Sequence, residues 1–212
     1  MPDTSTPTAV ARRSRGLLAL RWCAPVLAAT LALTGCTVAS PVTVDQSTIS
    51  TDVLISATMA VSEASVKIDY TLTNQSGVDL WVVHHQGPSA IPDQTRSNGV
   101  ALSLAFFPVR GDVNYVRPPA TFVAPVAASG SLTGSLTASR PFQPYADLPG
   151  DRKVSVPSHP TSVRLCIGYV IAAEVSPVSA PKPVGESKYP ALNDAVGFPL
   201  QHLACSAPTP LS

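Results

Sequence analysis

The chain contains little charge and few aromatic residues. Asp, Glu, Lys and Arg make up only 13% of its 212 residues, and the 14 basic residues nearly balance the 13 acidic ones. Four of the basic residues are arginines within the first 21 positions. A nucleic-acid-binding surface needs a concentrated basic field to neutralise phosphates. The composition therefore argues against a nucleic-acid partner.

The common catalytic and phosphate-binding motifs are also absent from the sequence. It contains no G-x-S-x-G elbow for a nucleophilic serine, and GSLTG at 130–134 is not followed by the Lys and Ser/Thr of a phosphate-binding loop. Asp147 and Asp151 flank a Pro-Gly turn, where aspartate is common, and so do not indicate the carboxylate pair of a glycosidase. We therefore expect no catalytic activity and no cofactor.

Histidine is the scarce residue type that still offers a site. His84 and His85 are adjacent, and His159 and His202 are the only others. Adjacent side chains of a strand point to opposite faces, so the pair could bind one metal ion only at a bulge. We predict no metal site, and we retain Trp81, His85 and His202 as candidate binding residues. The alternative is a small extracytoplasmic hydrolase or metal-binding protein that uses His84 or His85 with His202.

An uncharged, mostly apolar stretch at 22–33 follows the basic N-terminal segment. As a helix it would extend about 18 Å, well short of the roughly 30 Å of a bilayer's hydrocarbon core. A basic segment followed by a short apolar run is the layout of a signal peptide. The pattern thus predicts export across a membrane rather than a permanent membrane-spanning helix.

The apolar run ends in Leu33-Thr34-Gly35-Cys36, which resembles the lipobox of bacterial lipoproteins. The resemblance implies cleavage before Cys36 and a diacylglyceryl group on its sulfur, which would hold the mature chain at the membrane through two or more acyl chains. The location would be the cell envelope, on the outer leaflet of the cytoplasmic membrane or on the outer membrane. An ordinary secretory peptide and an uncleaved anchor remain the alternatives.

Two cysteines remain in the mature chain beyond the lipidation site. In an oxidising envelope we expect Cys166 and Cys205 to form a disulfide, the alternative being two buried free thiols. Alternation along 162–175 places Leu165, Ile167 and Tyr169 on one face of a strand and Cys166 on the other. The disulfide should therefore lie near an outer face and link neighbouring late strands.

Proline-rich composition and period-two alternation predict an all-β domain. Nineteen of the 22 prolines fall after Cys36. We expect a hairpin of strands 66–73 and 78–85 around the turn NQSG, and a loose tail at 207–212. Further strands are expected near 53–61, 100–109, 132–139, 162–175 and 198–206, and shorter extended segments at 112–119 and 120–127 are broken by Pro118-Pro119.

The predicted fold is an immunoglobulin-like antiparallel β-sandwich of seven or eight strands with long proline-rich loops. The segment VKIDYTLTNQSGVDLWVV resembles the early strands of such domains in bacterial envelope proteins. The expected organisation is a signal peptide at 1–35, a lipidated tether at 36–50, the sandwich at 51–206 and the tail.

The leading functional hypothesis is a membrane-anchored, non-catalytic binding or structural module. Its long loops, chiefly 86–99 and 176–197, would contact an envelope protein partner. A third hypothesis is an envelope inhibitor or protective lipoprotein that acts through a disulfide-braced loop.

Overall fold

The computed structural model describes residues 50–109, 111, 113–116, 119–145, 154–177, 179–184 and 187–211. The predicted signal peptide, the predicted lipidation site Cys36 and most of the predicted tether lie outside the described residues. In the described part of the chain, no helix is long and apolar enough to cross a membrane.

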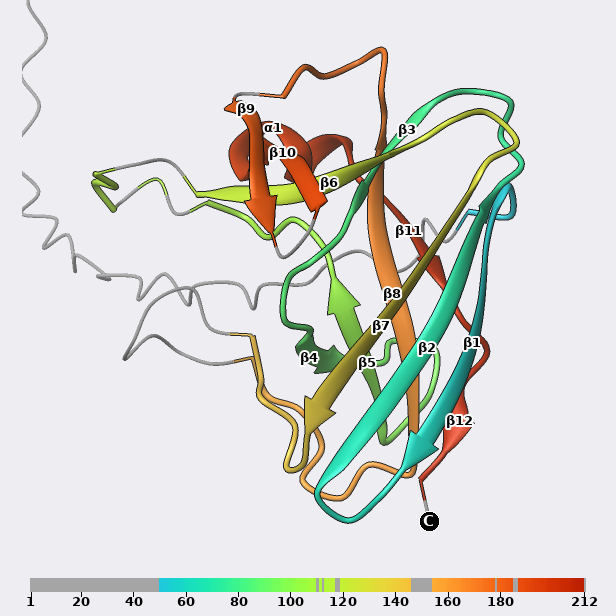
Figure 1. The fold of residues 1–212 in the computed structure, drawn as a ribbon. Coiled ribbons are helices and arrows are strands. Elements are labelled where there is room, and N and C mark those ends of the chain that lie inside the picture. Colours follow the sequence, from blue (N-terminus) through green and yellow to red (C-terminus); the bar gives the residue numbers. More distant parts are fainter. Residues whose placement is uncertain are drawn as a thin grey trace, which may run out of the picture. The chain divides into compact units, whose positions relative to one another are not determined.

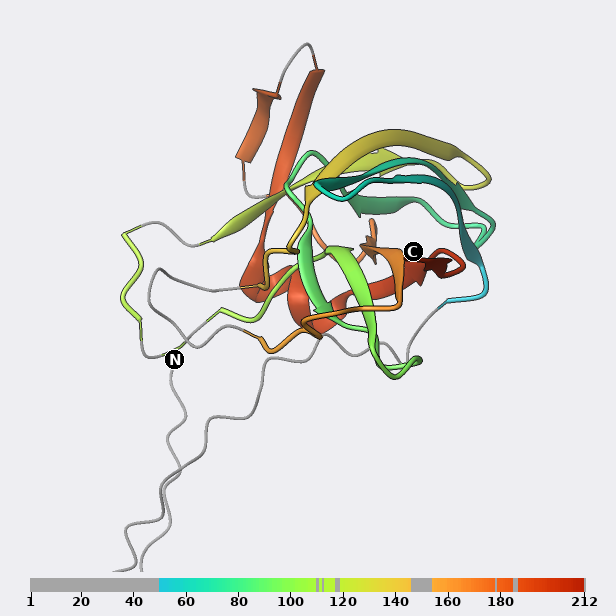
Figure 2. The same cartoon turned by 90° about the horizontal axis from the view of Figure 1, so that it is seen from below.

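Two sheets face each other across a shared core, which confirms the predicted all-β sandwich (Figures 1 and 2). The smaller sheet has the strand order β1-β2-β7, and the larger one has the order β4-β5-β8-β3-β6-β10-β9, with β11 and β12 also paired to β8. The smaller sheet consists of β1 (Val53–Val61), β2 (Ser65–Asn74) and β7 (Ser131–Ser139). The larger sheet contains β3 (Leu80–Val83), β4 (Ser89–Pro92), β5 (Gly99–Leu104), β6 (Ala120–Val126), β8 (Ser162–Ile171), β9 (Ser179–Val184), β10 (Ser187–Asn193), β11 (His202–Cys205) and β12 (Thr209–Pro210).

The core forms because one face of strand β2 is apolar. Val66, Ile68, Tyr70 and Leu72 are buried, whereas the alternate residues are partly or fully exposed. Their side chains pack against apolar residues of β3, β5, β6 and β8 in the opposite sheet. This is the inside-outside alternation of a half-buried antiparallel strand, as the sequence predicts.

Strand β8 is the centre of the larger sheet. Its first nine residues are buried, and it pairs along both edges. Tyr169 lies opposite Val82 of β3 and His202 of β11, while Val163 lies opposite Val100 of β5 and Thr209 of β12. One edge of β8 therefore carries β5 and β3, and the other carries β12 and β11.

The described residues form twelve strands, which corrects the expected seven or eight. The additional strands arise mainly in segments expected to be loops: residues 89–92 form β4, and residues 179–193 contain the β9/β10 pair. A buried ion pair joins the β4–β5 connection to β8, since Arg164 lies 2.7 Å from the Asp93 carboxylate. The strands are not all antiparallel either, since β5 runs parallel to β8.

The expected hairpin of 66–73 and 78–85 is wrong. Strand β2 pairs with β1 and β7, whereas β3 pairs with β6 and β8 in the other sheet. The Asn74 side-chain amide donates to the carbonyl oxygens of Val78 and Ala127, at 2.7 and 3.0 Å. These bonds hold the connection as an arch between the sheets rather than as a turn within one.

The disulfide between Cys166 and Cys205 joins neighbouring strands, as predicted. The face that bears it is not open to solvent, however, since Cys166 is fully buried. A second apolar cluster covers it, with Ile91, Phe107 and Leu203 among its members. The main core lies on the other face of β8, so the disulfide is no central pin between the sheets.

The C-terminal segment is not a loose tail. Thr209 and Pro210 form β12 against the start of β8, and the Leu211 amide donates to the Thr161 carbonyl at 2.9 Å. A short helix, α1 (Asp194–Leu200), precedes β11. Apolar contacts of Leu211 with the core explain why these residues stay with the sandwich.

Candidate functional site

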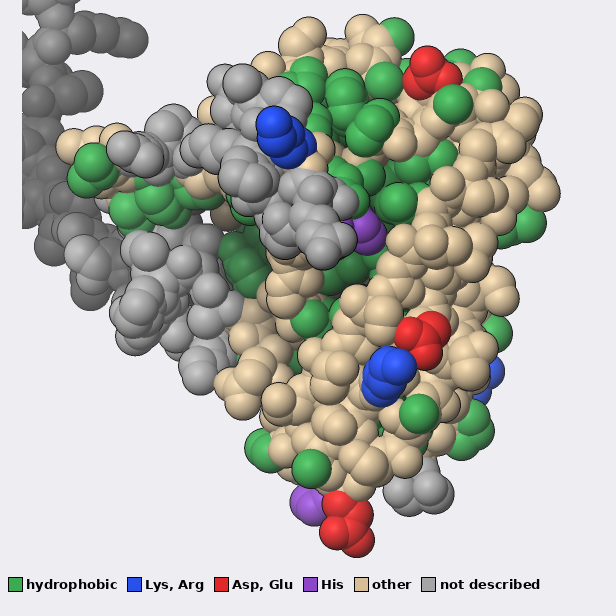
Figure 3. All heavy atoms as spheres, viewed as in Figure 1, with side chains coloured by type: hydrophobic (Ala, Val, Ile, Leu, Met, Phe, Trp, Pro, Cys, Tyr) green, Lys and Arg blue, Asp and Glu red, His purple; other side chains and the backbone are tan. Residues whose placement is uncertain are grey.

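A pocket of about 270 Å³ opens between the two sheets, beside strand β7. The space-filling view shows a hollow there, with a histidine and hydrophobic side chains within it (Figure 3). Its lining comes from β2, from the segment after β3, from the end of β5, and from β7 and β10. The lining residues are Tyr70, His84, His85, Gln86, Leu104, Thr133, Gly134, Ser135, Leu136 and Tyr189.

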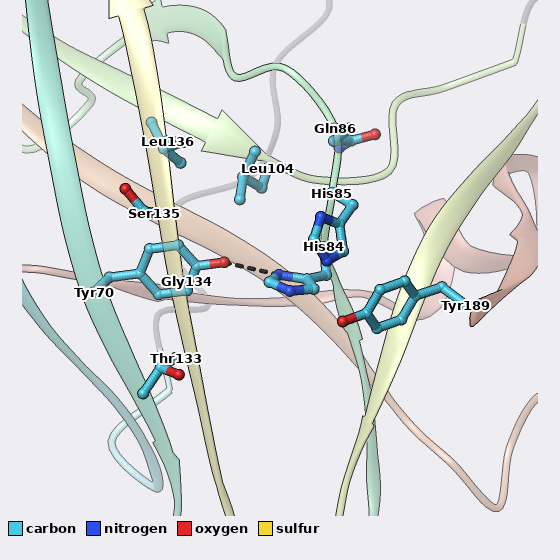
Figure 4. A pocket seen from close by; sticks show the side chains of 10 residues that line it. All are labelled: Tyr70, His84, His85, Gln86, Leu104, Thr133, Gly134, Ser135, Leu136 and Tyr189. Atoms are coloured by element: carbon cyan, nitrogen blue, oxygen red, sulfur yellow. Dashed lines mark hydrogen bonds between the residues drawn. The ribbon is translucent and has the colours of Figure 1, made fainter. Parts of the chain in front are cut away.

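The side chain of Tyr70 crosses the neighbouring strand to reach this pocket. Gly134 lies directly opposite Tyr70 in the β2/β7 register. A Cβ atom at position 134 would overlap the Cζ and Oη atoms of the Tyr70 ring. The missing side chain of Gly134 therefore lets the phenol lie across β7, with its hydroxyl 2.9 Å from Nδ1 of His84 (Figure 4). A glycine within a strand often marks a bulge, but the β2/β7 register is regular at Gly134.

His84 and His85 both face the pocket, contrary to the expectation from strand alternation. Strand β3 ends at Val83, and His85 has a positive φ of 56°. This left-handed conformation is uncommon for residues with a side chain, although histidine adopts it more readily than most. It turns the second ring back toward the first, so that the ring centroids lie 4.0 Å apart. The Tyr189 ring of β10 lies 4.5 Å from His85 and 5.4 Å from His84.

Tyr70 and His84 are both uncharged at neutral pH. Burial lowers the pKa of His84 to about 4, with a smaller contribution from neighbouring His85. It also raises the pKa of the Tyr70 phenol to about 12, aided by Tyr189. The phenol can donate or accept, so the tautomer of neutral His84 decides which of the two groups donates in this hydrogen bond. The pair is thus an oriented, neutral hydrogen-bonding unit.

The candidate binding residues fall in three different places. His85 lines the pocket, together with His84. His202 lies on β11, where its ring stacks on Tyr169 with centroids 5.5 Å apart, and it does not line this pocket. Trp81 is partly buried against the main core. The structure therefore brings His85 together with His84 and separates both from His202 and Trp81.

The pocket offers at most a two-histidine metal site. Among the described residues, no group of three or more His, Cys, Asp or Glu side chains lies close enough to hold a metal ion. His84 and His85 would need Tyr189 or water to complete a coordination sphere. No Lys, Arg, Asp or Glu is found among the described lining residues. The arrangement is suited to hydrogen bonding and ring contact with an uncharged group.

Three residues of the site were not predicted from the sequence: Tyr70, Gly134 and Tyr189. Tyr70 fits the alternation of a core strand, and Tyr189 lies in a proline-rich segment with no strand pattern. The one available signal was Gly134, because a lone glycine within a strand pattern often marks either a bulge or the close approach of another part of the chain. Which residue makes the approach depends on strand register, and that became known only with the structure.

Comparison of the chain with protein-family models, with curated protein sequences and with solved structures finds no match. The functional conclusions below therefore depend on the residues of the chain itself.

Proposed function

We propose that this chain is a bacterial lipoprotein whose β-sandwich is a non-catalytic binding module for a protein of the cell envelope. A lipid on Cys36 would hold it at the membrane, and the pocket lined by Tyr70, His84, His85 and Tyr189 would receive a side chain of the partner. The domain would act by holding that partner near the membrane surface.

The observation that carries the proposal is that both segments expected to contact a partner contribute residues to the pocket. Gln86 begins the first segment expected to contact a partner, and Tyr189 belongs to the second; both line this pocket. The Gln86 side chain is fixed by a 3.1 Å hydrogen bond to the Ala105 carbonyl. Aromatic rings with a polar atom at one end are common anchors in protein interfaces. The site thus joins two surface segments around oriented rings.

The N-terminal sequence supports the anchor. The four residues 33–36 match a lipobox, and the basic segment and apolar run before them have the order of a signal peptide. Fourteen residues, 36–49, would connect the lipid to the first described residue. Fully extended, they would span up to about 50 Å, enough to let the sandwich reach a partner above the membrane.

Site-specific photo-crosslinking tests the binding site. A photoreactive residue replaces Gln86 at the pocket, and a matched control replaces exposed Thr58 on β1. In intact cells we expect one envelope protein to be trapped from position 86 and not from position 58. Tyr189→Ala should abolish that product, because it removes a ring from the pocket. Equal products from both positions, or none from either, would contradict the proposed site.

Detergent phase partition tests the anchor. Full-length protein should enter the detergent phase, and its intact mass should include a diacylglyceryl group. Cys36→Ser should lose both properties, since the thioether cannot form. Cys23→Ser is the matched control and should behave as the unaltered chain. An unmodified Cys36 thiol in the native product would exclude the lipoprotein assignment.

A second candidate, binding of a transition-metal ion, is favoured by the 4.0 Å separation of the His84 and His85 rings. The hypothesis from the sequence combined His84 or His85 with His202, whereas in the structure His84 and His85 lie together and His202 lies elsewhere. Titration calorimetry with Zn²⁺ and Cu²⁺ would test it. Binding that is lost in His85→Ala and kept in His202→Ala would support a metal site, and absence of binding would exclude it.

A further inference from the structure

Strand β7 leaves one side of the smaller sheet open. It pairs with β2, and no other strand pairs with it in the described part of the chain. Figure 1 shows it along the side of the sheet opposite to β1. Its sequence, SLTGSLTAS, contains no charged residue and no proline. Soluble proteins commonly protect an edge strand with such residues, and β7 has neither along its nine residues.

The hydrogen bonds at both ends of the β2/β7 ladder show which backbone groups of β7 are open. The Asn74 amide donates to the Gly130 carbonyl at 2.9 Å, and the Arg140 amide donates to the Ala64 carbonyl at 2.8 Å. The backbone amides and carbonyls of even-numbered β7 residues therefore point toward β2. Hydrogen-bonding direction alternates along an antiparallel strand. The amides and carbonyls of Ser131, Thr133, Ser135, Thr137 and Ser139 thus point outward, ready to pair with a further strand.

The sequence of β7 is self-complementary in an antiparallel pairing centred on Ser135. On the outer face, this register places Ser131 opposite Ser139, Thr133 opposite Thr137, and Ser135 opposite its own copy. On the inner face it places Leu132 opposite Ala138, and Leu136 opposite Gly134, where the Tyr70 ring of the same copy fills the space left by the missing side chain. The hydroxyl pairs of the outer face favour cross-strand contact. No other symmetric register uses all nine residues of the strand.

The inner face of such a pair would lie beside the pocket. Leu132 and Leu136 are only partly buried, although they belong to the core side of the sheet. Thr133, Gly134, Ser135 and Leu136 also line the pocket. Pairing would cover the exposed parts of both leucines.

We propose that two copies of this chain associate through their β7 strands and form a continuous six-stranded sheet, β1-β2-β7-β7-β2-β1. The second copy is the occupant that the self-complementary sequence specifies. Such an isologous contact places the same residues on both sides of a two-fold axis. The association requires neither the pocket ligand nor the envelope partner proposed above, so each proposal can fail alone.

Cysteine crosslinking of the full-length protein in detergent micelles tests the register. The two Ser135 Cα atoms would lie about 5.5 Å apart across the axis, within disulfide range. Ser135→Cys should therefore give a covalent dimer under mild oxidation, which reductant returns to monomer. Ser139→Cys is the matched control, because the two copies of that residue would lie about 27 Å apart. No dimer from Ser135→Cys, or equal yields from both variants, would overturn the proposal.

A proline variant tests the contact without a new covalent bond. Ser135→Pro removes an amide that points outward, so it should leave the β2/β7 ladder intact and abolish the dimer in sedimentation velocity. Ala57→Pro is the control. The Gln75 amide donates a hydrogen bond to the Asp52 carbonyl, so the amides of even-numbered β1 residues point toward β2 and those of odd-numbered residues point outward, on the opposite edge of the sheet. It should leave the dimer unchanged. A Ser135→Pro protein that keeps its circular dichroism spectrum and remains dimeric would contradict the β7 contact.

Discussion

Gly134 is the residue on which the geometry of the pocket depends. Its missing side chain provides the space in which the Tyr70 ring crosses β7 and reaches His84. An aromatic ring that covers a glycine on a neighbouring strand also shields the exposed backbone there from water. The requirement for glycine at this position is therefore steric and does not come from backbone conformation.

Gly134→Ala should destabilise the protein by about 1–3 kcal/mol, because the new methyl group overlaps the Tyr70 ring and forces it away. Urea unfolding measures the change. A double-mutant cycle provides the control: in a Tyr70→Ala background the same substitution should cost little. An equal cost in both backgrounds would show that the glycine serves some purpose other than accommodating the ring.

His84 should make the fold sensitive to mild acid. Its pKa is about 4 in the folded protein and about 6.5 when exposed, because burial disfavours the imidazolium. Between these values the unfolded chain binds a proton that the folded chain does not, so stability falls as pH falls from 6.5 to 4. The loss should amount to about 1–3 kcal/mol. In His84→Gln, urea midpoints should vary less over this range, with His85→Gln as the control for the neighbouring ring.

At the scale of strands, local pattern was informative where one face of a strand is apolar. Residues 53–61 form β1 and residues 162–171 form β8, both close to their predicted bounds. The pattern did not predict which sheet a strand joins. The segment NQSG is compatible with a hairpin and with an arch, and the bond from Asn74 to Ala127, 53 positions away, accompanies the arch.

The site was harder to predict for the same reason. Period-two alternation separates adjacent histidines, and only the left-handed backbone of His85 brings the two rings together. Glycine would have marked such a position in the sequence, whereas histidine does not. Tyr70 and Tyr189 reach the pocket from two different sheets. Their meeting depends on the packing of the sheets, which strand alternation does not describe.

The disulfide should stabilise the β8/β11 pair by restricting the unfolded chain. It closes a loop with a sequence separation of 39 residues. The chain-entropy relation gives about 4 kcal/mol for a loop of this length. We expect Cys166→Ala combined with Cys205→Ala to lower the free energy of unfolding by up to this amount, as measured in urea. The unaltered protein under reducing conditions is the control, and no difference between it and the oxidised form would argue against stabilisation by the disulfide.

At the scale of the molecule, both ends of the described chain are tied to the larger sheet. The Ser50 amide donates to the Leu203 carbonyl at 3.0 Å, while Leu211 is bonded to Thr161. The sandwich thus includes residues that sequence composition assigned to a tether and a tail. A proline-rich composition indicates a lack of helix, but it does not indicate whether a short terminal segment can pair with an open strand edge.

Removal of residues 207–212 should destabilise the protein by about 1–3 kcal/mol. The truncation deletes the β12 pairing and the apolar contacts of Leu211. Thermal unfolding should show a lower midpoint, whereas deletion of Ser212 alone should leave it unchanged. If both truncated proteins unfold at the same midpoint temperature as the full chain, the terminal strand contributes nothing to the stability of the fold.

The position of β8 also determines when the protein can complete its folding. Two of the strands that flank it, β11 and β12, come from the last eleven residues of the chain. During synthesis, a chain that has not yet reached those residues leaves one flank of β8 unpaired. The pairing of the central strand is therefore completed only when residues 202–210 are available.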